Sequence, residues 1–197
     1  PTPLFDNVTP GKYIIQAQFE DLYLPTGYHQ GDENLDSDLQ NINGVYVSDT
    51  ISICSGQMFD NIDFGLANNY AEIGGVVFTD MMRNGQLMTI DELLIGIPVV
   101  LFDASNMEVA STVTDANGAY IFNNIIAGDY YVVFDLGDRL VTLSDVGEDA
   151  TDSDVTETNG VGSTDIIILS PGGSNLTIFA GVYELSSIGD FVWSDDN

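Results

Sequence analysis

Residues 73–80 read Ile73-Gly74-Gly75-Val76-Val77-Phe78-Thr79-Asp80, a run of β-branched and aromatic residues that predicts a strand followed by a carboxylate. A matching run returns 115 residues later as Ile188-Gly189-Asp190-Phe191-Val192-Trp193-Ser194-Asp195. A strand that recurs at the spacing of one small domain indicates a repeat. This repeat sets the organisation of the whole chain.

Two further blocks recur at nearly the same spacing. Residues 31–38 match residues 147–154 at a distance of 116, and residues 10–15 match residues 127–132 at 117. Tandem arrays of this kind usually have mechanical or spatial roles, because each unit contacts its neighbours.

The spacing predicts three segments. Residues 1–70 form the C-terminal part of one repeat, residues 71–186 a complete repeat, and residues 187–197 the first strand of a following repeat. Few residues separate the repeats, so we expect them to stand in line as a stiff rod. We also expect the chain to be a window on a longer polypeptide, with strand donation between separate subunits as the alternative.

The composition is strongly acidic but typical of a folded protein. There are 31 Asp and Glu against 3 Lys and Arg, for a net charge of −28, while 44% of the residues are hydrophobic. A disordered acidic tail would lack those core formers. The charge argues against nucleic acid and anionic lipid as partners and favours divalent cations. No apolar run is long enough to span a bilayer, and the lone Cys54 is expected to be a small buried hydrophobe.

Short alternating segments predict an all-β fold. Their spacing is typical of a β-sandwich, and only Met88–Leu94 suggests a turn or two of helix. The strands are expected at residues 13–20, 73–79, 97–103, 107–114, 119–123, 130–134, 165–169 and 175–183.

An ordered string of motifs runs through the complete repeat. It comprises Thr114-Asp115-Ala116-Asn117-Gly118-Ala119-Tyr120-Ile121-Phe122, then Ala127-Gly128-Asp129-Tyr130, the Asp-Ser-Asp block that ends at Asp154, and Ile188-Gly189-Asp190-Phe191-Val192-Trp193. This string resembles the B repeats of serine-aspartate-repeat surface proteins (SdrD-like B domains), which are related to collagen-adhesin B-type domains. The resemblance implies tandem prealbumin-like or Ig-like β-sandwich repeats on an extracellular surface stalk or filament, with Ca²⁺ in their loops.

The family offers a second stabiliser, a Lys–Asn isopeptide bond, which the complete repeat cannot form. Lys12 is the only lysine of the chain, and its counterpart in the complete repeat is Asp129. Calcium, core packing or contacts between neighbouring repeats are therefore expected to stiffen this protein.

The loop after residue 79 partly matches an EF-hand. Asp80, Asn84, Gly85 and Asp91 stand at positions one, five, six and twelve, and Gln86 offers a carbonyl oxygen. Met82 and Met88, however, occupy positions three and nine, where sulfur is too soft a ligand for calcium. Glu92, which follows position twelve by one residue, is the candidate to compensate for the missing oxygen ligands. The alternative is a simple Asn-Gly turn.

Two acidic clusters are the other candidate calcium sites. Crowded carboxylates repel one another unless a cation neutralises them, and the same spacing returns in both repeats. The alternative is an exposed acidic loop that water and salt screen. The clusters are Asp145, Glu148, Asp149, Asp152 and Asp154 in the complete repeat, and Asp32, Glu33, Asp36 and Asp38 in the first.

The sequence predicts a structural function. Paired carboxylates such as Asp152 and Asp154 are also used by glycosidases, but this loop lacks the apolar cleft that raises one acid's pKa. His29 is expected to be a surface residue, and no nucleotide-binding motif is present. We therefore expect a calcium-stabilised spacer, not an enzyme, whose partners are neighbouring repeats. The alternative is an adhesin module that binds a host protein or glycan through exposed Tyr23, Tyr28 and Tyr46.

Overall fold

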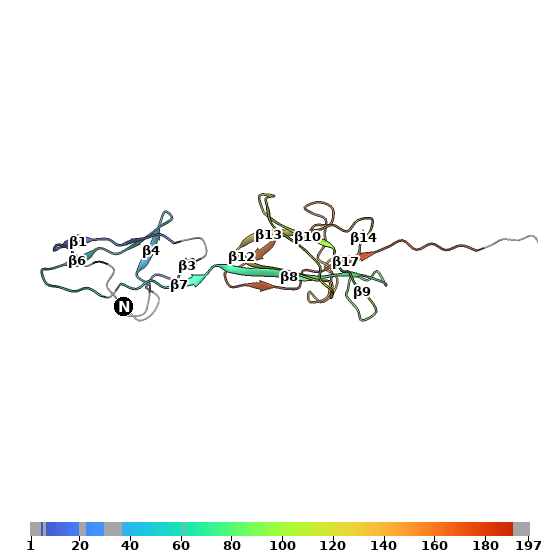
Figure 1. The fold of residues 1–197 in the computed structure, drawn as a ribbon, viewed down its shortest axis with the longest axis horizontal. Helices are drawn as coiled ribbons and strands as arrows, with labels where there is room; N and C mark the ends of the chain where they lie inside the picture. Colours follow the sequence, from blue (N-terminus) through green and yellow to red (C-terminus); the bar gives the residue numbers. More distant parts are fainter. Residues whose placement is uncertain (1–4, 6, 20–22, 30–36, 61, 191–197) are drawn as a thin grey trace, which may run out of the picture. The chain divides into compact units, whose positions relative to one another are not determined.

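A computed structural model of the chain describes residues 5, 7–19, 23–29, 37–60 and 62–190. The chain divides into two compact units, Pro1–Tyr70 and Ala71–Asn197 (Figure 1). All regular structure in the described residues is strand and none is helix, which confirms the prediction of an all-β fold. Accordingly, these residues provide no apolar helix of membrane-spanning length.

The second unit is a sandwich of two sheets (Figure 1). One sheet has the order β11-β10-β13-β15, and each neighbouring pair is antiparallel. In this sheet Val99 on β10 lies opposite Phe134 on β13. Its strands are β10 (Pro98–Asp103), β11 (Glu108–Val113), β13 (Gly128–Phe134) and β15 (Ile167–Leu169).

The other sheet is built around the long strand β8. Its order is β12-β8-β17-β14, and β9 and β16 also pair with β8. Strands β8 and β17 run parallel, with Val182 opposite Thr79, so both strands finish at the same end of the sheet. The strands are β8 (Tyr70–Thr79), β9 (Glu92–Leu93), β12 (Ala119–Ile126), β14 (Leu140–Val141), β16 (Ser174–Asn175) and β17 (Ala180–Tyr183).

The core lies between these two sheets. Alternate residues of a strand point to the same face, so every second side chain of the central strands enters the core. The ring of Tyr120 packs edge-on against Phe134 across the sandwich, with centroids 5.4 Å apart. Other members of the core include Ile73, Val77, Val99, Leu101, Val132, Ala180 and Val182, none of which exposes any surface.

The first unit contains short strands and repeats details of the second. Ile15 N donates to Ser48 Oγ at 3.0 Å, as Val132 N donates to Thr164 Oγ1 at 3.1 Å, in keeping with the 116–117-residue spacing. The strands of this unit are β1 (Gly11–Tyr13), β2 (Gln16–Ala17), β3 (Tyr23–Pro25), β4 (Leu39–Ile42), β5 (Val45–Ser48), β6 (Ile51–Ile53) and β7 (Leu66–Asn68).

Several local predictions were wrong. Residues 88–94 form turns and β9 instead of a helix, because β8 pairs with Leu93 and the carbonyl of Val77 accepts the Leu94 amide. The predicted strand 175–183 is interrupted, since the Ile178 carbonyl accepts the buried Tyr120 hydroxyl. The predicted strand 13–20 is divided between β1 and β2.

Cys54 is exposed instead of buried. It follows the last residue of β6 and enters a turn, where its amide donates to Gln57 Oε1 at 3.0 Å.

Candidate functional site

The loop of residues 80–91 begins where β8 ends, and a buried carboxylate organises it. Asp80 is only 2% exposed. Its Oδ2 accepts hydrogen bonds from Gly85 N at 2.7 Å and Thr142 Oγ1 at 2.6 Å, and its Oδ1 accepts one from Met82 N at 3.1 Å. Burial raises the pKa of Asp80, but the hydrogen bonds outweigh burial and leave that pKa below its usual value.

Asp91 closes the other end of this loop. Its Oδ1 accepts from Met81 N at 2.9 Å and its Oδ2 from Met88 N at 2.7 Å. Asn84 Oδ1 accepts from the amide of Gln86, and Asn84 Nδ2 donates to Met88 Sδ at 3.0 Å. The side-chain oxygens predicted to bind calcium here therefore already accept hydrogen bonds from the loop itself.

Glu92 lies outside this arrangement. It belongs to the exposed strand β9, where it pairs with Thr79.

The acidic loop 145–154 lies beside loop 80–91. The backbone joins them: Leu87 N donates to Thr151 O at 2.7 Å, and Ser153 N donates to Gly85 O at 3.0 Å. The side-chain Nε2 of Gln86 donates to Val146 O at 2.8 Å. The two candidate sites that the sequence treated separately therefore form one surface, which we call the paired loops (residues 80–91 and 145–154).

Three of the acidic side chains in loop 145–154 face the body of the domain. Asp154 Oδ2 accepts from Phe179 N at 2.7 Å, and Asp149 Oδ2 accepts from Thr177 Oγ1 at 3.1 Å. Asp152 is buried, whereas Asp145, Glu148 and Asp149 are exposed. Asp145 has φ 53°, a left-handed conformation that is uncommon for a residue with a side chain.

Burial and mutual repulsion perturb these carboxylates. The pKa of Asp154 is raised to about 7: burial contributes most, the charges of Asp152, Asp149 and Asp145 add to it, and a backbone hydrogen bond opposes it. Burial likewise raises the pKa of Asp152, with smaller contributions from Asp145 and Asp149. A cation among these groups would relieve the repulsion.

The side chains of the paired loops match a hard cation in chemistry but do not form a complete ligand shell. Within the described ranges, no three acidic, histidine or cysteine side chains are gathered as metal ligands. The acidic side chains offer oxygen, which calcium prefers, and calcium takes six to eight such ligands. Carboxylates of loop 145–154 would therefore need backbone carbonyls, the Gln86 amide oxygen or water to complete the shell.

The corresponding loop of the first unit is only partly described. Asp38 Oδ2 accepts from Asp63 N at 2.7 Å, which reproduces the bond between Asp154 and Phe179. His29 Nε2 lies 3.3 Å from Asp38 Oδ1, and the His29 ring stacks on Tyr28. The other predicted ligands, Asp32, Glu33 and Asp36, lie outside the described residues.

Sequence reasoning missed two residues of the site. The hydroxyl of Thr142 donates to Asp80, and Ser153 Oγ accepts from Gly181 N at 3.0 Å. Both are buried. The signal was present in the repeat, because Thr26 and Ser37 occupy the matching positions.

The raised pKa of Asp154 predicts an unusual pH dependence of stability without metal. The folded state keeps this proton up to about pH 7, whereas the unfolded chain loses it near its ordinary pKa of about 4. Between these values the folded state binds more protons, so the free energy of unfolding falls as pH rises. In the presence of chelator, we expect the urea concentration at the unfolding midpoint to decrease as the pH rises from 5 to 7.5. Asp154→Asn should make this decrease smaller.

Asp129→Asn is the control for this pH dependence, because Asp129 is an exposed carboxylate on β13. This variant should retain the wild-type fall. Equal pH profiles for wild type and Asp154→Asn would contradict the prediction.

The fold and the site together define a class of protein. A β-sandwich whose buried polar groups hold its loops, in a chain that repeats, is a repeat domain of a tandem array. The chain belongs to the SdrD B-like domain family, whose model matches residues 71–182.

Two relatives share similarity along nearly the whole chain. It is 30% identical over 197 residues to serine-aspartate repeat-containing protein F of Staphylococcus epidermidis, covering 98% of this chain and 11% of that protein. It is 29% identical over 196 residues to serine-aspartate repeat-containing protein D of Staphylococcus aureus, covering 98% of this chain and 14% of that protein. The chain therefore spans only a small part of the length of these relatives.

Similar solved structures include two pilins. The minor pilin GBS52 of Streptococcus agalactiae has a TM-score of 0.40 at 10% identity, covering 78% of this chain and 69% of the pilin. The major pilin subunit BcpA of Bacillus cereus has a TM-score of 0.35 at 13% identity, covering 87% and 60%.

Proposed function

We propose that this chain is a calcium-stabilised spacer in the stalk of an extracellular surface protein. Membership of the SdrD B-like domain family and similarity to serine-aspartate repeat-containing proteins support a role as a structural repeat of a surface protein. The observation that supports calcium is the crowding of carboxylates in loop 145–154, where Asp145, Asp149 and Asp152 lie within electrostatic reach of the half-buried Asp154. A cation bound there offsets the repulsion and links loop 145–154 to loop 80–91.

The proposed role is mechanical. The paired loops lie beside the edge at which β8 and β17 end, and Asp80 N donates to Val182 O at 2.7 Å. Calcium at this place stabilises the end of the sandwich from which the chain continues. Its contribution to folding follows from mass action, because the folded state binds the ion and the unfolded chain does not.

Calcium is expected to raise the free energy of unfolding of the second unit by about 2.7 kcal/mol at 100 times its dissociation constant. Thermal melts in calcium and in excess chelator, at constant ionic strength, measure this difference. The double variant Asp149→Asn, Asp152→Asn should lose most of the calcium effect, because it removes two carboxylates from the loop. Asp129→Asn removes one negative charge outside the paired loops, so this variant should retain the calcium effect. Identical midpoints with and without calcium would sink the proposal.

A second candidate function, an adhesin module, is supported by one groove in the first unit. The groove has a volume of about 480 Å³, and Phe19, Tyr23 and Tyr46 are among its lining residues. Phe19 and Tyr46 pack edge to face at 5.6 Å. Tyr28 instead stacks on His29 and donates to Asp49 Oδ2. In the second unit the residues that match Ala17 and Phe19 are Phe134 and Leu136, and both are buried core residues. Positions that line the groove thus serve as core in the second unit, so we propose the spacer as the function.

A further inference from the structure

The second unit exposes six apolar side chains within loop 80–91 and in the four residues that follow it. We call Met81, Met82, Met88, Ile90, Leu93 and Ile95 the apolar loop surface; each exposes between 42% and 65% of its area. Three of the five methionines of the chain are among them. Exposed apolar surfaces of this kind usually mark a contact site.

An ordered backbone presents these side chains. The carboxylate of Asp91 holds the amides of Met81 and Met88 together, and Leu93 pairs with Phe78 of β8. A surface held in place before contact loses little conformational entropy when a partner binds. The apolar loop surface is therefore suited to a fixed contact.

The chain leaves the domain at this same edge. Strands β8 and β17 are parallel and end together, so Asp80 and Tyr183 are neighbours there. The guanidinium of Arg83, within loop 80–91, lies 4.3 Å from the centre of the Tyr183 ring. The departing segment thus contacts the loop that carries the apolar surface.

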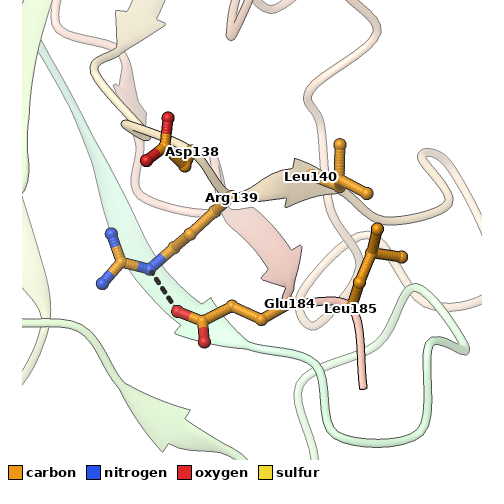
Figure 2. Close-up of a pocket in the computed structure, with 5 residues that line it drawn as sticks. All are labelled: Asp138, Arg139, Leu140, Glu184 and Leu185. Atoms are coloured by element: carbon orange, nitrogen blue, oxygen red, sulfur yellow. Dashed lines mark ion pairs between the residues drawn. The ribbon is translucent and has the colours of Figure 1, made fainter. Parts of the chain in front are cut away.

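A second arginine holds the next residue of the departing segment. Arg139 Nε lies 3.7 Å from Glu184 Oε1. Figure 2 shows this ion pair at an open pocket of about 540 Å³, with Asp138, Leu140 and Leu185 around it. Exposed ion pairs are individually weak. The direction of the departing segment therefore depends on both arginine contacts together. Two of the three basic residues of the chain therefore lie at its exit.

The length of the connection identifies the partner. The match of Ile188 to Ile73 predicts that the following repeat begins at Ile188. Residues 184–187 extend over roughly 14 Å at most, at 3.3–3.6 Å per residue. A repeat that follows at this distance lies within reach of the apolar loop surface.

We infer that the apolar loop surface is the contact on which the next repeat of the same chain packs. Because the repeats are acidic, buried apolar area between them offsets their repulsion. The inference rests on the proposed stalk arrangement but not on calcium. It gives the exposed methionines, which the calcium hypothesis does not use, a role between repeats.

The experiment extends the full chain beyond Asn197 with residues 83–187, which completes a third repeat on the pattern of the second. The emission of Trp193, the single tryptophan, first verifies that this repeat is folded. Methyl NMR with a soluble paramagnetic probe then compares the extended and original chains. We expect the relaxation caused by the probe to fall at least threefold at Met81 and Met82, which the appended segment does not duplicate. Met58, which is exposed elsewhere and is also not duplicated, is the internal control and should not change.

A pair of variants tests whether the apolar side chains make the contact. Ile90→Ser with Ile95→Ser should restore access of the probe to Met81 and Met82 in the extended chain, without destabilising the original chain. Ile168→Ser, at a more exposed isoleucine of β15, should leave the protection intact. Equal probe access in both chains, in calcium and in chelator, would overturn the inference. Calcium-dependent melting would still support the proposed function in that case.

Discussion

Asp80→Ala is expected to lower the free energy of unfolding of the second unit by about 3–5 kcal/mol in chelator. The substitution leaves Gly85 N and Thr142 Oγ1 buried without their acceptor, and each buried unpaired donor costs about 1–3 kcal/mol. The Met82 amide loses its acceptor as well. Urea unfolding, followed by circular dichroism without metal, measures the loss independently of calcium binding.

Asp91→Ala is the matched control for Asp80→Ala. The Asp91 carboxylate also accepts two backbone amides of the same loop, but these bonds are exposed to water. Water replaces a lost acceptor there, so we expect a cost of about 1 kcal/mol or less. Similar losses for the two variants would contradict the idea that burial makes Asp80 the organiser of the loop.

The sequence was sufficient to predict the class of fold, because strands leave a local pattern. The run of β-branched and aromatic residues that predicts a strand at residues 73–79 lies within β8, and the repeat spacing relates Ile15 to Val132 in an equivalent hydrogen bond. Strand ends were less predictable. The break at Ile178 depends on a hydroxyl 58 residues away, and such a distant bond leaves no local pattern.

The site was predictable as a set of residues but not as an arrangement. Spacing identified Asp80 and Asp91 as the two ends of a loop, which the structure shows them to be. The bond between Gly85 and Ser153 joins two distant segments through their backbones, and backbone atoms carry no sequence signal. The sequence did not single out Thr142, because a threonine in an apolar segment is usual in a strand.

Phe78→Ala is expected to destabilise the second unit by about 3–5 kcal/mol. Phe78 exposes no surface, yet it follows Val77 in β8 and therefore points away from the core between the sheets. A Cβ atom at Gly181 would lie 2.7 Å from Cζ of the Phe78 ring and 2.6 Å from Thr142 Cγ2. The ring, Gly181 and Thr142 are thus packed together on the outer face of the sheet, beside the acceptor Asp80.

This prediction distinguishes two descriptions of the outer face of the sheet. If the paired loops pack firmly over Phe78, the ring is a second small core, and its loss also weakens the loops and their calcium response. If the loops are only loosely attached, water fills the space and Phe78→Ala costs about as little as Ile168→Ala, an exposed control on β15. Phe78→Leu, which retains most of the apolar volume, should cost about 1 kcal/mol. Urea unfolding of the three variants in chelator and in calcium decides between these descriptions, because only firm packing links the loss of an apolar ring to weaker binding of a cation.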